Sequence, residues 1–322
     1  MKIRLARRLA PVIALLAAAP AAATAAELTA NAKTVVATFA KAKPGDVLRL
    51  KGEFPALLVF YAKDRTFSPA LTVDATDARL SAVIFNGVTG IRWNGGVFTG
   101  VPGRPAFSAA NGGDIKVSQI DFRGDGTINA VVFRNMKGVA LADSRLDRPR
   151  VGVSLVDVED VSVVGNTIQG WSGDGIGLAG VTRGEIRKNS CRDPVRVEAG
   201  LHIDCIQGYF AHPRPNSHIL VTQNYVTGFE TQGVFFNAFP GYPPPDHIVA
   251  EENTVETGDA PNGVALDGGP TNIARNNRTS TLKGSRWRTD VKVFGGSISC
   301  GNKTEAYLRW KSVAEPPCKD AR

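Results

Sequence analysis

The chain has 322 residues, 43% of them hydrophobic, so it is long and apolar enough to bury a continuous core, and extended disorder is excluded. The 38 Lys and Arg against 30 Asp and Glu give a formal charge of +8, which first suggests a basic globular protein. The 34 Gly and 19 Pro indicate many turns, and only two Met, with little Leu after the first residues, argue against a helical bundle.

Residues 1–26 have the pattern of a secretory signal peptide. Four cations precede an apolar run and then a stretch of small residues: Lys2, Arg4, Arg7 and Arg8, then 9–19, then 21–26. Removal of this segment leaves 34 basic and 30 acidic residues, a net charge near +4. No later run approaches the roughly 20 apolar residues of a membrane-spanning helix. The mature chain is therefore expected to be secreted or periplasmic, soluble, monomeric and without membrane contact.

The four cysteines are an even number in an exported chain, which favours two disulfides over thiol catalysis. Pairing nearest neighbours gives Cys191 with Cys205 and Cys300 with Cys318, although four cysteines allow three pairings. The spacings match no zinc motif.

After the signal peptide, the sequence predicts a short helix at 33–42, followed by a Pro-Gly turn and a strand at 47–50. Such a helix would cover the open apolar end and the unpaired edge of whatever follows. At the other end, YLRW at 307–310 and a Cys300–Cys318 link would form a C-terminal cap over 300–322.

Between these ends the chain repeats. Strings such as VSVVGNTI, ILVTQNYV and IVAEENTV align on one position, with steps of 24, 24, 22, 23, 35, 29, 24 and 25 residues: Gly96, Ile120, Ser144, Asn166, Asn189, Asn224, Asn253, Asn277 and Asn302. Asn tolerates a left-handed backbone and satisfies turn amides, so the asparagines predict an internal hydrogen-bonded ladder.

A second string recurs with the same period and alternates with period two, which places one apolar residue of each repeat toward a core: Val131, Val153, Ile176, Ile206, Val234 and Val264. A unit of about 24 residues cannot bury its apolar face alone, but stacked units can. The sequence therefore predicts an all-β, single-domain parallel β-helix over 27–322, with coils about 4.8 Å apart.

The opening segment AKPGDVLRLKGEF and the Asn-centred repeat resemble the right-handed parallel β-helix proteins of the pectate-lyase-like superfamily. The resemblance covers nearly the whole mature chain. It implies the fold more strongly than an activity, because that superfamily includes polysaccharide lyases, hydrolases, epimerases, esterases and adhesins.

The 35-residue step marks an insertion over 190–218, and insertions in solenoids form loops on one face, often the binding face. It holds three of the four histidines: His202, His212 and His218. The following 29-residue step adds an aromatic loop with Phe239 and Tyr242.

Parity from the inward Ile206 predicts that Cys205 and Gln207 point outward, next to a shallow trough that an extended polymer could occupy. Asp204 occupies the same repeat position as Asp174, Gln232 and Asn262, which suggests a polar turn position. Two roles of Asp204 therefore stay open: a turn cap in a polar stack, or a catalytic carboxylate. His202 has no counterpart in other coils, which favours a functional role.

Cations gather by register on or near the coils that carry the insertion: Arg183, Arg187, Lys188, Arg192, Arg196 and Arg214. A solvated charged face explains any one of them, but the group suits the carboxylates of an acidic polysaccharide. His212, Arg214, Gln207, Arg187, Lys188 and Tyr225 are the residues expected to bind that substrate.

Cleavage of a uronate polymer by β-elimination needs a neutraliser for the C5 carboxylate, a base for the C5 proton and an acid for the leaving oxygen. His202 as base, Tyr209 as acid and Arg196 or Arg214 as neutraliser form such a set, with Asp204 as a further catalytic candidate. We therefore expect a polysaccharide lyase. C5 epimerisation uses nearly the same groups and stays open.

Three other classes remain to be weighed. Glycoside hydrolysis needs two carboxyl groups, for which Asp174 and Asp204 are the candidates, and a non-catalytic surface protein also fits. No cofactor is assigned, although Ca²⁺ bound by Asp193, Glu198 and Asp204 is conceivable. Nucleic-acid partners are disfavoured by export and modest charge.

Overall fold

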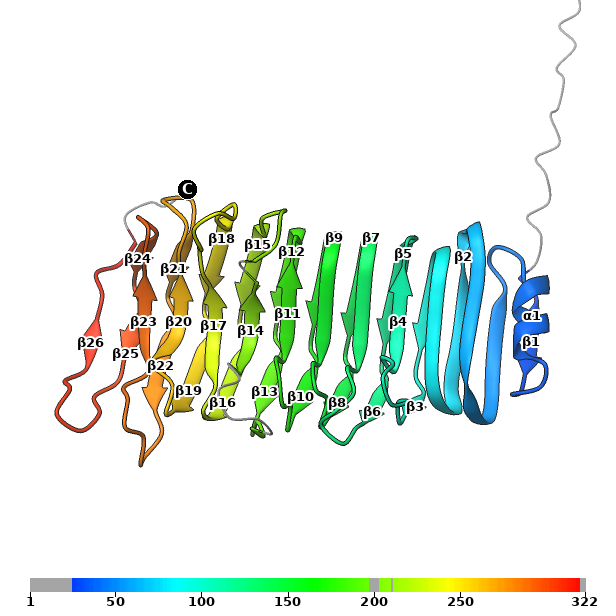
Figure 1. The fold of residues 1–322 in the computed structure, drawn as a ribbon, viewed down its shortest axis with the longest axis horizontal. Coiled ribbons are helices and arrows are strands. Elements are labelled where there is room, and N and C mark those ends of the chain that lie inside the picture. Colours follow the sequence, from blue (N-terminus) through cyan, green and yellow to red (C-terminus); the bar gives the residue numbers. More distant parts are fainter. Residues whose placement is uncertain (1–24, 197–202, 210, 319–322) are drawn as a thin grey trace, which may run out of the picture.

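The computed structural model describes residues 25–196, 203–209 and 211–318, so most of the predicted signal peptide lies outside the described part. These residues form an elongated stack of β-coils with one short helix at the N-terminal end (Figure 1). The predicted all-β parallel β-helix is confirmed. Within the described residues, no helix reaches the length and apolar character that crossing a bilayer requires.

The N-terminal end holds the helix and the first coils. α1 spans Val35–Lys41 and buries Val35 and Phe39 against the first coil, which is how it covers the open end of the stack. The strands here are β1 (Glu27–Ala30) and β2 (Val47–Asn94), which pair in parallel from Glu27 with Val47 onward.

Each later coil contributes to three faces, and successive strands of a face pair in parallel. The first face contains β4 (Phe107–Ala110), the first parts of β7 (Val131–Ala142) and β9 (Val153–Val164), β11 (Ile176–Ala179), β14 (Asp204–Gly208), β17 (Gln232–Phe236), β20 (Asn262–Leu266) and β23 (Asp290–Val293).

The second face contains β5 (Gly113–Ser118), the later parts of β7 and β9, β12 (Thr182–Arg187), β15 (Ser217–Thr222), β18 (Asp246–Glu251), β21 (Ile273–Arg275) and β24 (Ile298–Cys300). The third face contains β3 (Val97–Phe98), β6 (Asp121–Arg123), β8 (Arg145–Asp147), β10 (Thr167–Gln169), β13 (Ser190–Arg192), β16 (Tyr225–Phe229), β19 (Thr254–Gly258), β22 (Arg278–Thr281) and β25 (Lys303–Thr304).

The core is the row of apolar residues that the sequence predicted. Ile176 pairs with Val153 on one side and Ile206 on the other, and Ile206 pairs with Val234. These side chains are fully buried, and full burial of such a side chain stabilises the fold by roughly 1.5–3 kcal/mol. Toward the N-terminus the core becomes aromatic, with Phe85 stacked on Phe60 at a ring-centroid distance of 5.0 Å.

The asparagine ladder is also confirmed. Asn224 Nδ2 donates to Asn253 Oδ1 at 3.0 Å, and the same pattern joins each rung to the next from Asn166 to Asn302. All six asparagines are buried, so these bonds are formed away from water, where an unmade bond is costly.

The left-handed backbone of this turn is not on the asparagines, contrary to expectation. It falls on the residue before each one: φ is +55° at Lys188, +57° at Gln223 and +55° at Glu252. The preceding residue makes the turn, which leaves the asparagine side chain directed inward along the stack.

The C-terminal end closes differently from the coils. β26 (Val313–Ala314) pairs antiparallel with β25, and Glu315 accepts a 2.7 Å hydrogen bond from Asn302 Nδ2, the last rung. Cys300 is bonded to Cys318, and Cys191 to Cys205, so the nearest-neighbour pairing is confirmed.

Candidate functional site

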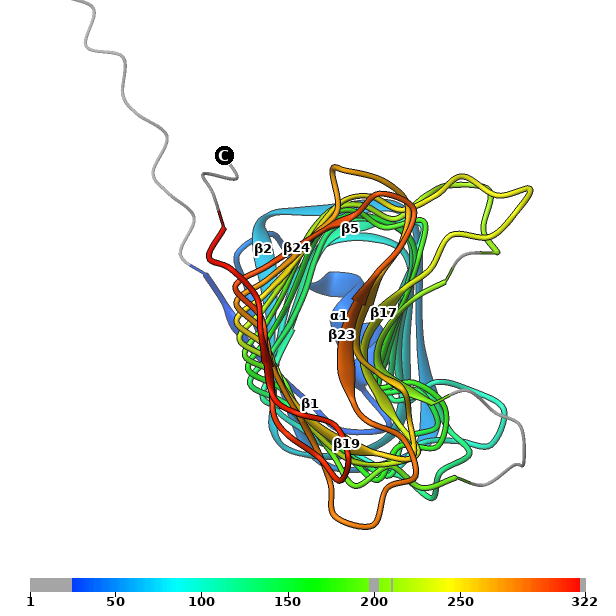
Figure 2. The same cartoon turned by 90° about the vertical axis from the view of Figure 1, so that its left-hand side faces the viewer.

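The long repeat forms two loops instead of one. Residues 193–203 join β13 to β14, and residues 209–216 join β14 to β15, so the two loops border opposite ends of β14. The loop at 237–245 follows β17, on the next coil. Figure 2 shows loops projecting from the stack at both edges of the face that contains β17. The first face around β14 is therefore the surface that the insertions flank.

A row of polar side chains crosses four coils where the strands of this face begin. Asp204 is aligned with Gln232, and its carboxylate accepts a 3.0 Å hydrogen bond from Gln232 Nε2. Its backbone N–H donates to Asp174 Oδ1 at 3.2 Å, and Asn262 Nδ2 donates to Gln232. Asp204 is fully buried and Asp174 is 6% exposed. Buried polar groups need such partners, so the turn-cap interpretation of Asp204 accounts for its position.

Tyr209 brings a hydroxyl to this row. The residue follows β14, its N–H donates to the Leu178 carbonyl at 2.8 Å, and its ring folds back over Gly177. A Cβ at Gly177 would lie 2.9 Å from Tyr209 Cε2, so the glycine is what allows the ring to lie there. The hydroxyl donates to Asp174.

The surroundings keep Tyr209 protonated. Burial of its hydroxyl raises the pKa above that of an ordinary tyrosine, and the charge of Asp174 and the hydrogen bond to it raise the pKa further. The residue as a whole is still 40% exposed. The Tyr209 hydroxyl is therefore protonated, with its proton directed at Asp174.

Two arginines that each lie three residues before a first-face strand, Arg104 and Arg150, were not singled out from the sequence. The Arg150 carbonyl accepts a 2.7 Å hydrogen bond from the Gly173 N–H, beside the Asp174 that holds Tyr209, and the positive charge of Arg150 opposes the rise in the pKa of Tyr209. Arg150 also lines a shallow polar depression with Arg104 and Asn129. Both arginines lie in coils of ordinary length, so the repeat gave no signal for them.

Gln207 lies between Gly177 and Phe235 on neighbouring strands, as predicted, but it is only 5% exposed. The expected shallow trough is partly filled, because the Tyr209 ring covers Gly177.

The prediction that Cys205 points outward is wrong. Cys205 is fully buried and bonded to Cys191, which is itself buried in the core. The position before the inward isoleucine also faces the core here: a Cβ at Gly175, the equivalent of Cys205 one coil earlier, would lie 3.1 Å from Cys191 Sγ. Cys205 and Ile206 are therefore both directed inward.

The predicted cationic loop residues are ion-paired. Arg196 Nε lies 3.1 Å from Glu230, and Arg214 lies 3.4 Å from Asp157. His212 Nε2 is 3.5 Å from the same Asp157. Asp157, on β9, was missed from the sequence because it anchors the 209–216 loop through tertiary contacts alone.

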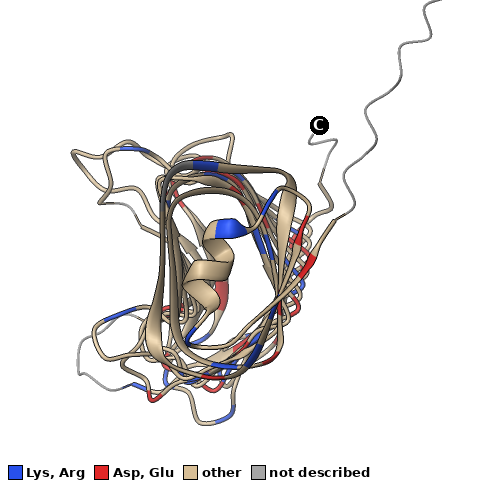
Figure 3. Ribbon diagram, turned by 90° about the vertical axis from the view of Figure 1, so that its right-hand side faces the viewer, with Lys and Arg blue, Asp and Glu red and all other residues tan. Residues whose placement is uncertain are grey.

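The other predicted binding residues lie on other faces. Arg187 ends β12 on the second face, 2.6 Å from Glu185, and Lys188 follows it in the left-handed turn. Tyr225 begins β16 on the third face, and its hydroxyl donates to Glu256 at 2.6 Å. Figure 3 shows Lys and Arg spread around the coil and mixed with Asp and Glu. The cations thus do not form one site.

His202, the predicted base, lies outside the described residues, and so does Glu198, one of the three oxygen ligands considered for Ca²⁺. Both remain predictions. Of the predicted catalytic set, the structure brings together Tyr209 and Asp204, through Asp174.

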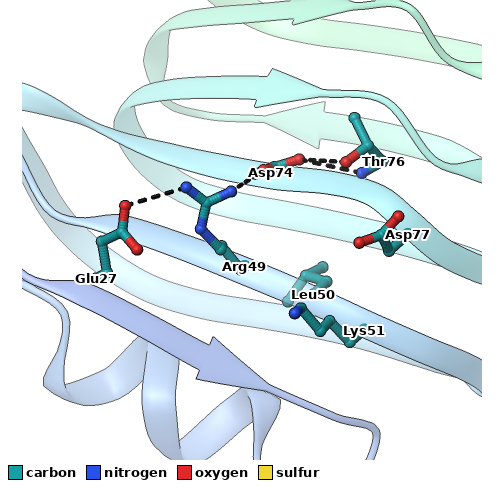
Figure 4. Close-up of a pocket in the computed structure, with 7 residues that line it drawn as sticks. All are labelled: Glu27, Arg49, Leu50, Lys51, Asp74, Thr76 and Asp77. Carbon is teal, nitrogen blue, oxygen red and sulfur yellow. Dashed lines mark hydrogen bonds and ion pairs between the residues drawn. The ribbon is translucent and has the colours of Figure 1, made fainter.

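A second polar depression lies at the N-terminal end, remote from the insertions (Figure 4). Its Arg49 is held between Glu27, at 3.0 Å, and Asp74, at 2.6 Å. Thr76 Oγ1 donates to Asp74 at 2.7 Å. These bonds neutralise the arginine and link β1 to successive turns of β2, which is a structural role.

No protein-family model matches the chain, and no curated protein matches it. Solved structures do. An endo-xylogalacturonan hydrolase from Aspergillus tubingensis superposes with a TM-score of 0.60 at 8% identity, covering 91% of this chain and 100% of that one.

The surface adhesin PfbA of Streptococcus pneumoniae superposes with a TM-score of 0.59 at 9% identity, covering 85% and 87% of the two chains. An alginate lyase from Paenibacillus sp. str. FPU-7 gives 0.52 at 14% identity, covering 85% and 99%. At these identities the similarity establishes the fold alone. The chain shares the parallel β-helix fold of these structures, as the sequence predicted.

Proposed function

We propose that the chain is an exported enzyme that cleaves a uronate-containing polysaccharide by β-elimination on the first face, with Tyr209 as the proton donor. The observation that carries the proposal is the Tyr209 hydroxyl, kept protonated against Asp174 on a partly exposed side chain between the insertion loops. Fold neighbours that include a lyase and a hydrolase of acidic polysaccharides support the substrate class.

The reaction needs three groups. A base, for which His202 is proposed from the sequence, removes the C5 proton, and the electron pair forms the C4–C5 double bond. The C4–O bond breaks, and Tyr209 gives its proton to the leaving oxygen. Arg150, exposed and close to Tyr209, is the proposed partner of the C5 carboxylate, because a fixed positive charge stabilises the negative charge that develops there.

Hydrolysis by Asp174 and Asp204 is less well supported. A hydrolase places both carboxyl groups against the scissile bond. Asp204 is fully buried and bonded to Gln232, so it does not reach a bound chain without rearrangement. Arg196 and Arg214 are weaker candidates for the neutraliser than Arg150, since each already faces a carboxylate.

The test is to incubate the mature protein with polymers of galacturonate, mannuronate, guluronate and glucuronate, and to follow the ultraviolet absorbance of unsaturated ends. Loss of a general acid typically costs about 10²–10⁴-fold in rate, so Tyr209→Phe should abolish most of the signal. Tyr61→Phe is the matched control, because Tyr61 is 76% exposed near the N-terminal end.

Each other outcome points to another function. Shortened chains without unsaturated ends would indicate hydrolysis. Binding without any change in chain length would indicate an adhesin-like protein. Full activity in Tyr209→Phe would refute the assignment of the proton donor.

A further inference from the structure

His218 and His247 form a pair on the second face, away from Tyr209. They occupy equivalent positions on β15 and β18, because Ser217 is aligned with Asp246 in the parallel register. Both have a left-handed backbone, with φ of +55° and +53°, so both side chains leave the sheet in the same way. Their rings stack with centroids 4.5 Å apart and planes 6° from parallel.

Asp246 completes the group. Its Oδ2 lies 2.8 Å from His247 Nδ1, and its Oδ1 accepts a 2.7 Å hydrogen bond from Thr271 Oγ1. Asp246 thus places a carboxylate directly beside the stacked imidazole pair.

We propose that His218, Asp246 and His247 bind a divalent transition metal ion such as Zn²⁺, Cu²⁺ or Ni²⁺. One ligand atom from each of the three residues lies within 4.8 Å of the others. Two imidazoles and a carboxylate suit these borderline ions better than Ca²⁺ or Mg²⁺, which select oxygen ligands. Three protein ligands leave further coordination positions for water.

Binding requires a small rearrangement. A tetrahedral ion at 2.0–2.1 Å from each nitrogen needs ligand atoms about 3.4 Å apart. An ion shared by both rings lies in both ring planes, so the nearly parallel rings must turn about their Cβ–Cγ bonds. That torsion has broad minima and both histidines are exposed, so the rings can turn at the cost of their mutual stacking.

The neighbouring charges allow a cation here. The equivalent position one coil earlier is Arg183, but its guanidinium is bonded to Asp160 at 2.7 Å and Glu159 at 3.1 Å. Because Arg183 is already paired, the carboxylate of Asp246 gives the group of His218, Asp246 and His247 a local negative charge.

The position gives such an ion a structural consequence. His218 lies just after the 209–216 loop, and His247 lies just after the 237–245 loop. An ion held by both would join the bases of two loops that border the first face. This inference does not depend on the proposed elimination chemistry, because no group assigned to that reaction binds the ion.

The test is titration of tag-free protein with ZnCl₂ by isothermal titration calorimetry, with CuCl₂ and NiCl₂ in parallel. We expect one saturable site in the wild type. His218→Ala and His247→Ala should each weaken Zn²⁺ at least about 10-fold, the lower end of what loss of even a supporting contact costs. Asp246→Asn tests the carboxylate in the same way.

His212→Ala is the matched control, since His212 is paired with Asp157 and lies outside the cluster. It should retain the wild-type Zn²⁺ affinity. Far-UV circular dichroism should match the wild type for every variant, because His218 and His247 are exposed. Absence of saturable binding, or equal loss in His212→Ala and the cluster variants, would overturn the proposal.

A second readout is the thermal unfolding midpoint. Zn²⁺ should raise the midpoint of the wild type and of His212→Ala, but not that of His218→Ala, because a ligand that binds the folded chain stabilises it by mass action.

Discussion

Asn224→Ala tests the asparagine ladder at an interior rung. The Asn224 side chain accepts from the Asn189 backbone N–H at 2.9 Å and donates to the Ile186 carbonyl at 2.8 Å. It also joins the amides of Asn189 and Asn253, at 3.1 and 3.0 Å. The side chain is 1% exposed, so water does not replace these partners in the intact fold.

The expected loss follows from the groups left behind. The Asn189 N–H and the Ile186 carbonyl each lose this partner, and an unsatisfied buried group costs roughly 1–3 kcal/mol. We therefore expect Asn224→Ala to lower the free energy of unfolding by about 2–5 kcal/mol, measured as a shift in the urea midpoint at unchanged slope.

Two further variants sharpen this test. Ser144 occupies the same row, and its Oγ accepts the Ile120 N–H at 3.2 Å. Asn224→Ser should therefore keep an acceptor for Asn189 and lose less stability than alanine. Gln169→Ala, a half-buried amide outside the ladder, should change stability by no more than about 0.5 kcal/mol. A loss for Asn224→Ala as small as that of Gln169→Ala would refute the energetic role of the ladder.

Three other predictions follow from the first face. Replacing Cys191 and Cys205 by Ser should cost roughly 3 kcal/mol of unfolding free energy, the value for a cross-linked loop of this length, and an unchanged denaturant midpoint would contradict it. The folded pKa of Tyr209 is raised, so the stability it contributes is present below the unfolded pKa of about 10 and is lost as the pH rises toward the folded value. Spectrophotometric titration should show a late phenol ionisation that Tyr209→Phe lacks, and identical curves would refute the shift. Gly177→Ala should displace the Tyr209 ring and reduce the proposed lyase rate with the circular dichroism unchanged, whereas Gly184→Ala, whose Cβ has no neighbour closer than 3.6 Å, should keep that rate.

The repeat made the fold predictable because its constraints are periodic. Ile176 and Ile206 occupy equivalent positions on adjacent coils. The alternation within a strand and the repeat length between strands are therefore enough to predict that both side chains face the core. The ladder was predictable for the same reason. The disulfide partners followed from chain proximity, since Cys191 and Cys205 are only 14 residues apart.

The site was less predictable because it depends on where the chain leaves the repeat. The length of the repeat showed that extra residues lie between Asn189 and Asn224. It did not show that β14 divides them into segments on either side. The inward direction of Cys205 departs from simple alternation, and the position of the Tyr209 ring depends on Gly177 of the neighbouring strand β11. Arg150 gave no signal, because its proximity to Tyr209 is purely tertiary.

The ladder and the insertions lie at different corners, and this separation has a physical cause. Asn189 and Asn224 form the turn between the second and third faces, where each amide must meet the next at about 3 Å. An added residue there would break the bonds of two coils. The insertions adjoin the ends of first-face strands, away from the ladder: 193–203, 209–216 and 237–245. These loops can therefore differ in length and chemistry while the coils stay in register, which makes the first face the part of this fold best suited to carry a specific activity.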